Sequence, residues 1–129
     1  MKAMRDRAPS ELSDEEREAR LLSTAGLAAR ARKAVFGTGQ ICEELRKGEI
    51  LFVIEASDTS ENTHKRLSDK TAFYGVPLCR VGASCERLAL LFGKRNGSIA
   101  AVGITDSGII RAMKKYLPPE QGGSGDEQI

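Results

Sequence analysis

The chain has 129 residues, of which 40% are apolar and 29% are charged, a balance that fits one compact domain and excludes two full domains. Its longest apolar runs, residues 50–54 and 99–102, are far shorter than the roughly 20 residues of a membrane span, and no secretion signal opens the chain. The three cysteines form no CxxC pair, which favours a reduced compartment. We therefore expect a soluble cytoplasmic protein without a membrane partner.

The positive charge is concentrated in the body of the chain. The whole sequence has a net charge of +2, but residues 26–117 carry 15 basic and nine acidic side chains, and residues 118–129 carry three acidic and no basic ones. A basic body of this size permits binding to phosphate polyanions, although many proteins without such a partner share it.

Predicted elements begin after a flexible arm at residues 1–12. Ser13 and Glu16 have the spacing of a capping box, so a helix should begin there and run to about Lys33, with Val35 still on its apolar side. Gly37 and Gly39 should break this helix, and a second one should follow at residues 40–47.

Strands and helices then alternate. The expected elements are a strand at 50–54, a helix capped by Asp58 or Ser60 and ending at Tyr74, a strand at 77–81, a helix at 85–92, a strand at 98–104, and a last helix capped by Thr105 or Asp106. This order predicts an α/β fold, a three-layer α/β/α sandwich around a small mixed sheet, with residues 13–117 as one domain. Residues 118–129, an acidic and Gly-rich tail, are expected to be disordered.

Function is expected in the loops at one end of the strands. Three polar loops are predicted to gather there, at residues 57–60, 82–84 and 105–108, because loops that follow the strands of such a sheet share an edge.

Catalytic chemistry finds little support in the sequence. His64 is the only histidine and is expected to be a solvated surface residue of a charged helix. Glu55 and Asp58 follow a central strand, where paired carboxylates can act as acid and base, but a helix cap is the simpler role for Asp58. Cys85 lies at a helix start, where the dipole lowers a thiol pKa, yet it has no histidine partner. We expect no enzymatic activity, no metal site and no cofactor.

The glycine turn at residues 37–39 is a candidate phosphate-binding site. It places the free amides of a helix N-terminus after Arg30, Arg32 and Lys33, which we expect to lie beside it. The alternative is a purely structural turn between two helices. The cations Lys65, Arg66 and Lys70, and the pair at 94–95, are expected to be solvated.

Several strings occur in a characteristic order along the chain: GLAARARK at 26–33, ASDTSENT at 56–63 with Asp69-Lys70, YGVP at 74–77, Gly93-Lys94, and TDSG at 105–108. Together they resemble the YlxQ-type bacterial members of the L-seven-Ae/L-thirty-e ribosomal protein superfamily, and the similarity spans residues 21–117. The resemblance implies an α/β/α sandwich with a four-stranded mixed sheet. It also implies RNA binding and association with ribosomes or translation.

The resemblance further implies which residues contact RNA. In that superfamily the RNA is typically a kink-turn, held by the start of the second helix and by the loop before a later helix; here these regions are residues 37–43 and 81–87. The residues expected to contact structured RNA, whether a kink-turn or other ribosomal RNA, are Arg32, Lys33, Gly37, Thr38, Gly39 and Gln40 in the first region and Val81, Gly82, Ala83 and Arg87 in the second.

The first region departs from the pattern of tight kink-turn binders, G-x-N-E-x-x-K. Aligned on Gly37, this chain offers Gly39, Gln40 and Glu43. Gln40 can still hydrogen-bond a base edge, whereas Gly39 has no side chain and Glu43 reverses the expected positive charge. Glu43 therefore favours an alternative function, a protein–protein interaction module in ribosome assembly or in transcription and translation complexes that has lost kink-turn binding.

Overall fold

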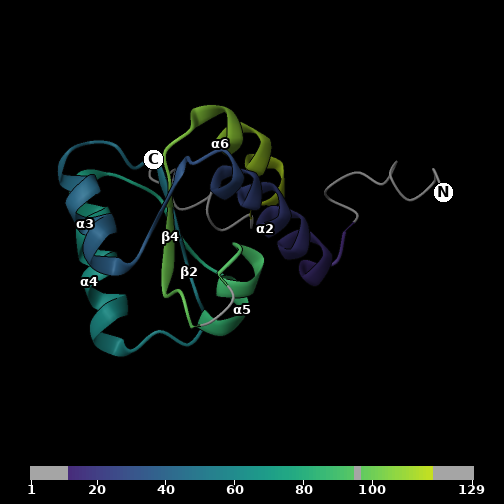
Figure 1. Ribbon diagram of the computed structural model, residues 1–129, viewed down its shortest axis with the longest axis horizontal. Helices are drawn as coiled ribbons and strands as arrows, with labels where there is room; N and C mark the ends of the chain where they lie inside the picture. Colours follow the sequence, from purple (N-terminus) through teal and green to yellow (C-terminus); the bar gives the residue numbers. More distant parts are fainter. Residues whose placement is uncertain (1–11, 95–96, 118–129) are drawn as a thin grey trace, which may run out of the picture.

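The computed structural model describes residues 12–94 and 97–117, which form an α/β/α sandwich, as the sequence predicts (Figure 1). In chain order the elements are α2 (Asp14–Arg30), β1 (Ala34–Phe36), α3 (Thr38–Arg46), β2 (Phe52–Glu55), α4 (Glu61–Tyr74), β3 (Leu78–Arg80), α5 (Cys85–Leu91), β4 (Ala101–Ile104), α6 (Ser107–Met113) and the 3-10 helix η2 (Lys114–Tyr116).

The four strands form one mixed sheet in the order β1-β4-β2-β3. Strand β4 is antiparallel to both of its neighbours, whereas β2 and β3 are parallel, with Glu55 beside Arg80. Strands β1, β2 and β3 therefore all end at the same end of the sheet, the lower one in Figure 1, which we call the loop end. Strand β4 ends at the opposite end, so the prediction that the loop at 105–108 joins the other two was wrong.

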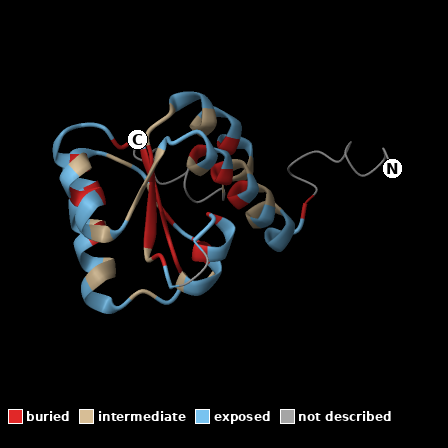
Figure 2. Cartoon of the chain, viewed as in Figure 1, coloured by how far each residue is buried: buried red, intermediate tan, exposed pale blue. Residues whose placement is uncertain are grey.

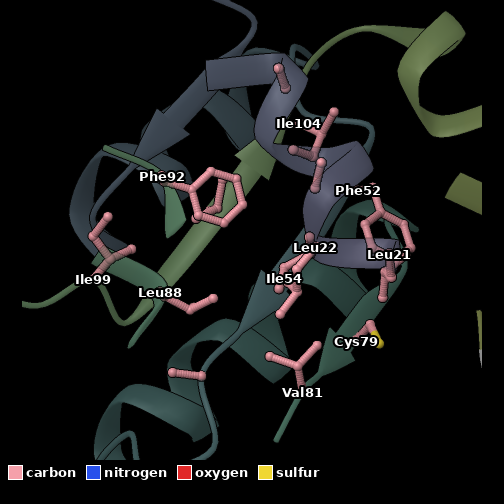
Figure 3. Packing of buried hydrophobic residues seen from close by; sticks show 14 of the residues in the cluster. Leu21, Leu22, Phe52, Ile54, Cys79, Val81, Leu88, Phe92, Ile99 and Ile104 are labelled. Atoms are coloured by element: carbon pink, nitrogen blue, oxygen red, sulfur yellow. The ribbon is translucent and has the colours of Figure 1, made fainter. Parts of the chain in front are cut away.

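Helices cover both faces of the sheet. Helices α3 and α4 pack on one face, and α2, α5 and α6 lie on the other (Figure 1). All residues of β2 and β4 are buried, while the outer faces of the helices are exposed (Figure 2). The larger part of the core lies under α2 and α5, where Leu21, Leu22, Leu88 and Phe92 meet Ile54 and Ile104 (Figure 3). A smaller apolar cluster under α3 and α4 contains Ile41, Leu45, Val53 and Leu67.

The first helix ends earlier than predicted, and a strand that the sequence did not reveal follows it. Helix α2 stops at Arg30, and Val35 lies in β1 instead of on the helix. The turn depends on Arg32, which adopts φ of 61°, the left-handed conformation that usually marks a glycine. Because an arginine takes that conformation, the sequence gives no signal for the break.

The other helix boundaries follow local rules. The Ser13–Glu16 capping box is present, Ser60 caps α4 instead of Asp58, Ser84 caps α5, and Asp106 caps α6. Residues 1–11 of the predicted arm, and the predicted tail at 118–129, lie outside the described residues; Leu12 is buried. In the part of the chain that the structure describes, no helix is long and apolar enough to cross a membrane.

Candidate functional site

The two regions predicted to contact RNA lie at the same end of the sheet, the loop end. The loops after β2 and β3 are joined directly, because the Ser57 amide donates a 2.8 Å hydrogen bond to the Ala83 carbonyl. The start of α3 follows β1 at the same end of the sheet, on the opposite edge. Since neighbouring strands lie about 4.8 Å apart, three strand spacings place the ends of β1 and β3 roughly 14 Å from each other.

The N-terminus of α3 differs from those of the other α-helices in the described residues. Gly37 is its N-cap, with φ of 94° and ψ of 135°, and it offers no side-chain acceptor. Helices α2, α4, α5 and α6 each have a serine or aspartate that accepts an amide of the first turn. The first turn of α3 also contains no acidic residue, so the amides of Thr38, Gly39 and Gln40 are left as an uncompensated positive end.

Lys94, which the sequence predicts to be solvated, lies next to this helix start. The Lys94 Nζ sits 4.8 Å from the ring centroid of Phe36, the last residue of β1. Phe36 in turn packs edge-to-face against Phe92, with the ring centroids 6.1 Å apart. The loop after α5 therefore brings a cation to the residue before Gly37, and the only sequence signal for it was the Gly93-Lys94 string.

The exposed face of α3 is held by its own side chains. The Gln40 Nε2 donates to Glu44 Oε2 over 3.1 Å, so its amide is already engaged in the absence of RNA. Glu43 forms an ion pair with Arg46, and the hydrogen bond from that guanidinium lowers the pKa of the Glu43 carboxyl. The negative charge of Glu43 is thus balanced within the helix. Gly39 has an ordinary backbone conformation, and a Cβ added there would meet no atom within 4 Å.

The second region contributes fewer exposed groups than predicted. Val81 is buried, with 5% of its surface exposed, and its amide bonds the carbonyl of Glu55. Gly82 is exposed, but its amide donates a 2.7 Å hydrogen bond to Glu18 Oε1 from the first half of α2. Glu18, Gly82 and Arg87 line an open pocket of about 520 Å³ between α2 and α5. Of the four residues predicted to contact RNA here, Gly82 and Arg87 are exposed, and the acidic Glu86 between them is exposed too.

Arg32 and Lys33 do not lie beside the start of α3. The carbonyl of Lys33 accepts hydrogen bonds from the amide and hydroxyl of Thr105, at the end of the sheet where β4 terminates. The three residues of β1 separate them from Gly37. The expectation that these cations flank the helix N-terminus was wrong because the segment between them is a strand and not a helical turn.

A buried carboxylate under the loop end was not foreseen. Glu55, the last residue of β2, is fully buried, and both of its oxygens lie within hydrogen-bond distance of His64 Nδ1, at 2.8 and 2.9 Å. The Thr59 hydroxyl donates to the same carboxylate over 2.5 Å. His64 keeps 40% of its side chain exposed, so it lies at the surface as predicted, but the prediction missed its hydrogen bond to the buried Glu55 of β2. The available signal was a glutamate directly after an apolar strand with the only histidine nine residues later.

Arg80 completes this network and fixes the loop between β2 and α4. Its Nε lies 3.8 Å from Glu55 Oε2, and its guanidinium donates to the carbonyl of Ser57 over 3.2 Å and to the Thr59 hydroxyl over 3.3 Å. The buried Glu55 carboxylate and the Arg80 guanidinium thus both hold this loop in place through hydrogen bonds. Such a loop presents its exposed backbone in one arrangement before any ligand binds.

Asp58 and Cys85 form a structural pair. The Asp58 carboxylate accepts the amide of Cys85, the first residue of α5, over 2.8 Å, and the hydrogen bonds from Cys85 lower the Asp58 pKa. Partial burial, reinforced by the adjacent carboxylate, raises the pKa of the Cys85 thiol to about 11. The expected lowering by the helix dipole was therefore wrong, since the nearby carboxylate and the loss of water outweigh it. Within the described residues no group of three or more His, Cys, Asp or Glu side chains could hold a metal.

Comparison with known proteins gives consistent matches. The family model described as "Ribosomal protein L7Ae/L30e/S12e/Gadd45 family" matches residues 19–113. The chain is 39% identical over 94 residues to a Bacillus subtilis (strain 168) protein named "RNA-binding protein YlxQ", covering 71% of this chain and 89% of that protein. A protein of the same name from Enterococcus faecium is 32% identical over 92 residues, covering 71% of this chain and 85% of the relative.

Solved structures agree with this assignment. A Bacillus halodurans protein of unknown function is 34% identical, with a TM-score of 0.69, and the match covers 76% of this chain and 96% of that one. The 15.5kD RNA binding protein of Giardia lamblia matches with a TM-score of 0.65 over 83% of this chain and 95% of that one, and at 16% identity it supports the fold alone. From the family match and the identity to two YlxQ proteins, we conclude that this chain belongs to the ribosomal protein L7Ae/L30e/S12e/Gadd45 family.

Proposed function

We propose that this chain is a non-catalytic protein that binds structured RNA through the loop end. The observation that carries the proposal is the uncapped, positive N-terminus of α3, which lies beside Lys94 at the same end of the sheet as Gly82 and Arg87. Free amides at a helix start together with nearby cations suit phosphate oxygens. The preorganised loop at residues 56–60 lies between these two parts.

The names of the relatives support this function. Both YlxQ proteins are named as RNA-binding proteins, and each is more than 30% identical to this chain. We infer that the bound RNA is ribosomal or another structured RNA such as a kink-turn, and that the protein works with ribosomes or translation in the cytoplasm. The contact residues would be Gly37, Thr38, Gly39 and Gln40 at α3, with Gly82, Ala83 and Arg87 at the loop before α5.

A second candidate is an interaction module for ribosomal, transcription or translation proteins. Two acidic side chains favour it, because both face regions where RNA phosphates would lie. Glu43 stands where a lysine is expected, and Glu18 already holds the amide of Gly82.

Binding of the full chain to a kink-turn RNA and to a plain duplex of equal length, each at two salt concentrations, tests the first proposal. We expect the kink-turn preference to survive the higher salt, because nonspecific phosphate binding weakens both RNAs alike. Equal, salt-labile binding to both RNAs would refute recognition of the kink and leave the second candidate.

Replacing Glu43 separates the two candidates further. Glu43→Lys should tighten kink-turn binding roughly three- to tenfold, because it replaces a negative charge with the cation of the family pattern. The matched control is Asp69→Lys on the outer face of α4. This substitution also replaces an exposed carboxylate with a cation and breaks an ion pair, the one between Asp69 and Lys65. An unchanged affinity in Glu43→Lys, with weak binding throughout, would argue for the interaction module.

A further inference from the structure

The structure brings together two segments of the chain that contain cations and no carboxylates. Residues 19–36 carry four basic and no acidic side chains, and residues 107–117 carry three basic and no acidic ones. These segments are neighbours in space, because α2 packs against α6 and η2 in the same helical layer (Figure 1). The positive excess of the chain body is therefore uneven, and much of it lies in this layer.

Six of the seven cations of these segments are exposed, and the seventh, Arg20, is partly buried. We call their six exposed members the α2–α6 basic face: Arg30, Arg32, Lys33, Arg111, Lys114 and Lys115. None of the six forms an ion pair with another residue in the ranges 12–94 and 97–117, whereas Arg17, Arg46, Lys47, Lys65 and Arg80 all do. Uncompensated charges on one surface add up to a local positive potential.

The face has a fixed framework. The amide and the hydroxyl of Thr105 both donate to the carbonyl of Lys33, over 3.0 and 3.1 Å, which joins the turn after α2 to the segment that enters α6. The seven residues of α6 span about 10 Å, at 1.5 Å per residue, so the cations of α6 and η2 continue the face over that length. The carbonyl of Lys33 lies at the end of the sheet opposite the loop end, so this face is separate from the uncapped start of α3.

We propose that the α2–α6 basic face binds the phosphate backbone of RNA that continues beyond the segment held at the loop end. This inference rests on the proposed function, and it assigns Arg32 and Lys33 to a second contact surface instead of the first. Lysine-rich surfaces are typical of backbone contacts, whereas protein interfaces are depleted in lysine and centre on apolar anchors. In the two segments Leu27 is the only large hydrophobic side chain that is exposed, which favours RNA over an acidic protein.

The test uses a charge-removing triple variant and two RNAs. The variant is Arg32→Asn, Lys33→Gln and Lys114→Gln, with asparagine chosen because it tolerates the positive φ at residue 32. The RNAs are a minimal kink-turn and the same kink-turn with a duplex extension on each arm. We expect the wild-type chain to bind the extended RNA more tightly, and the triple variant to lose at least roughly tenfold on that RNA. The slope of log K against log salt should fall by about 2 to 3, near 0.9 per lost cation.

The matched control removes the same charge elsewhere. The control variant combines three substitutions on α4, Lys65→Gln, Arg66→Gln and Lys70→Gln. All three residues are exposed, and α4 lies in the opposite helical layer (Figure 1). If both triple variants lose affinity equally, only net charge matters and the face is not a site. If the α2–α6 variant binds the extended RNA like the wild type, the inference is also wrong.

The two RNAs separate this inference from the proposed function. Preference of the minimal kink-turn over a plain duplex reports on the loop end alone, and the gain from the extension reports on the basic face. A chain that prefers the kink-turn but gains nothing from the extension keeps the proposed function and loses this inference. Tighter binding of polyglutamate than of an RNA of equal charge would assign the face to an acidic protein partner and overturn the RNA assignment.

Discussion

Single side chains occupy hydrogen-bonding groups at the loop end, the surface proposed to bind RNA. Glu18 is the clearest case, because its carboxylate accepts the Gly82 amide at 2.7 Å and a Cβ at Gly82 would lie 3.2 Å from its Oε2. A donor in the second region proposed to contact RNA is therefore occupied by a carboxylate of the same chain. RNA that used this amide would have to displace the carboxylate.

Glu18→Ala is accordingly expected to strengthen kink-turn binding about two- to fivefold, since it frees the amide and removes a repulsive charge. Glu15→Ala removes an equal charge from the same pocket without breaking a hydrogen bond to the loop, and it should have a smaller effect. Titration by fluorescence anisotropy gives both affinities, and hydrogen exchange of the Gly82 amide reports its release. Weaker binding by Glu18→Ala would show instead that the carboxylate orders the loop for RNA.

The Cys85 thiol gives a prediction about pH. With its pKa raised to about 11, the thiolate fraction at pH 8 is on the order of 0.1%, against roughly 10% for a thiol of ordinary pKa 9.0. Alkylation of Cys85 at pH 8 should thus be roughly a hundredfold slower than that of a free peptide thiol, and it should accelerate as the pH approaches 11. Asp58→Asn removes the adjacent negative charge, so it should lower the thiol pKa and speed the reaction. Mass spectrometry resolves Cys85 from the buried Cys42 and Cys79. Equal alkylation rates in the wild type and in Asp58→Asn would exclude an effect of Asp58 on the thiol.

Among the elements, the start of α3 depends on one glycine. Gly37 has φ of 94° and ψ of 135°, a combination that side chains rarely adopt. Gly37→Ala should therefore lower the free energy of unfolding by about 1–3 kcal/mol and weaken RNA binding, because the first turn must shift. Gly39→Ala is the matched control, since that position has open space and ordinary backbone angles, and it should be neutral or stabilising by up to about 1 kcal/mol. Urea denaturation measures both; equal losses would contradict a special role for Gly37.

The elements also show what the sequence can reveal and what it cannot. Helix starts were predictable wherever a side chain caps its own helix, as at Ser13 and Ser84, because the signal is local. Strand β1 was not predictable, since its three residues become a strand only by pairing with β4, and the turn before it depends on Arg32 instead of a glycine. The prediction for the loop after β4 was wrong for the same reason, because the direction of a strand is set by its pairing in the assembled sheet.

The candidate site, like the elements, was predictable where the signal is local in the sequence and not where it depends on packing. The resemblance predicted that the regions around Gly37 and Gly82 contact one ligand, and the structure places them at one end of the sheet. Lys94 and Glu18 could not be assigned to this end beforehand, because each comes from an element remote in sequence and reaches the site only through packing. Their contacts depend on long-range geometry, for which composition and periodicity carry no information.

At the scale of the whole molecule, the sandwich separates two surfaces of different character. The loop end contains charges of both signs, since Glu18 lines the same pocket as Arg87, and Asp58 and Lys94 lie at the same end of the sheet. Its specific features are hydrogen-bonding groups held in place. The α2–α6 basic face has no carboxylate in its own segments and presents charge alone. Specific recognition and backbone attraction would thus fall on different parts of one rigid fold, joined by the sheet.

This separation predicts that the two surfaces contribute independently to RNA affinity. Glu43→Lys at α3 and the pair Lys33→Gln with Lys114→Gln on the basic face share no described partner, and β1 lies between them. Changes at such sites usually add within about 0.5 kcal/mol. The combined variant should bind the extended kink-turn RNA with a free-energy change equal to the sum of the separate changes within that margin, measured at one salt concentration. A deviation of more than about 1 kcal/mol would mean that RNA engages both surfaces as one site, because coupling of that size is typical of groups that share contacts.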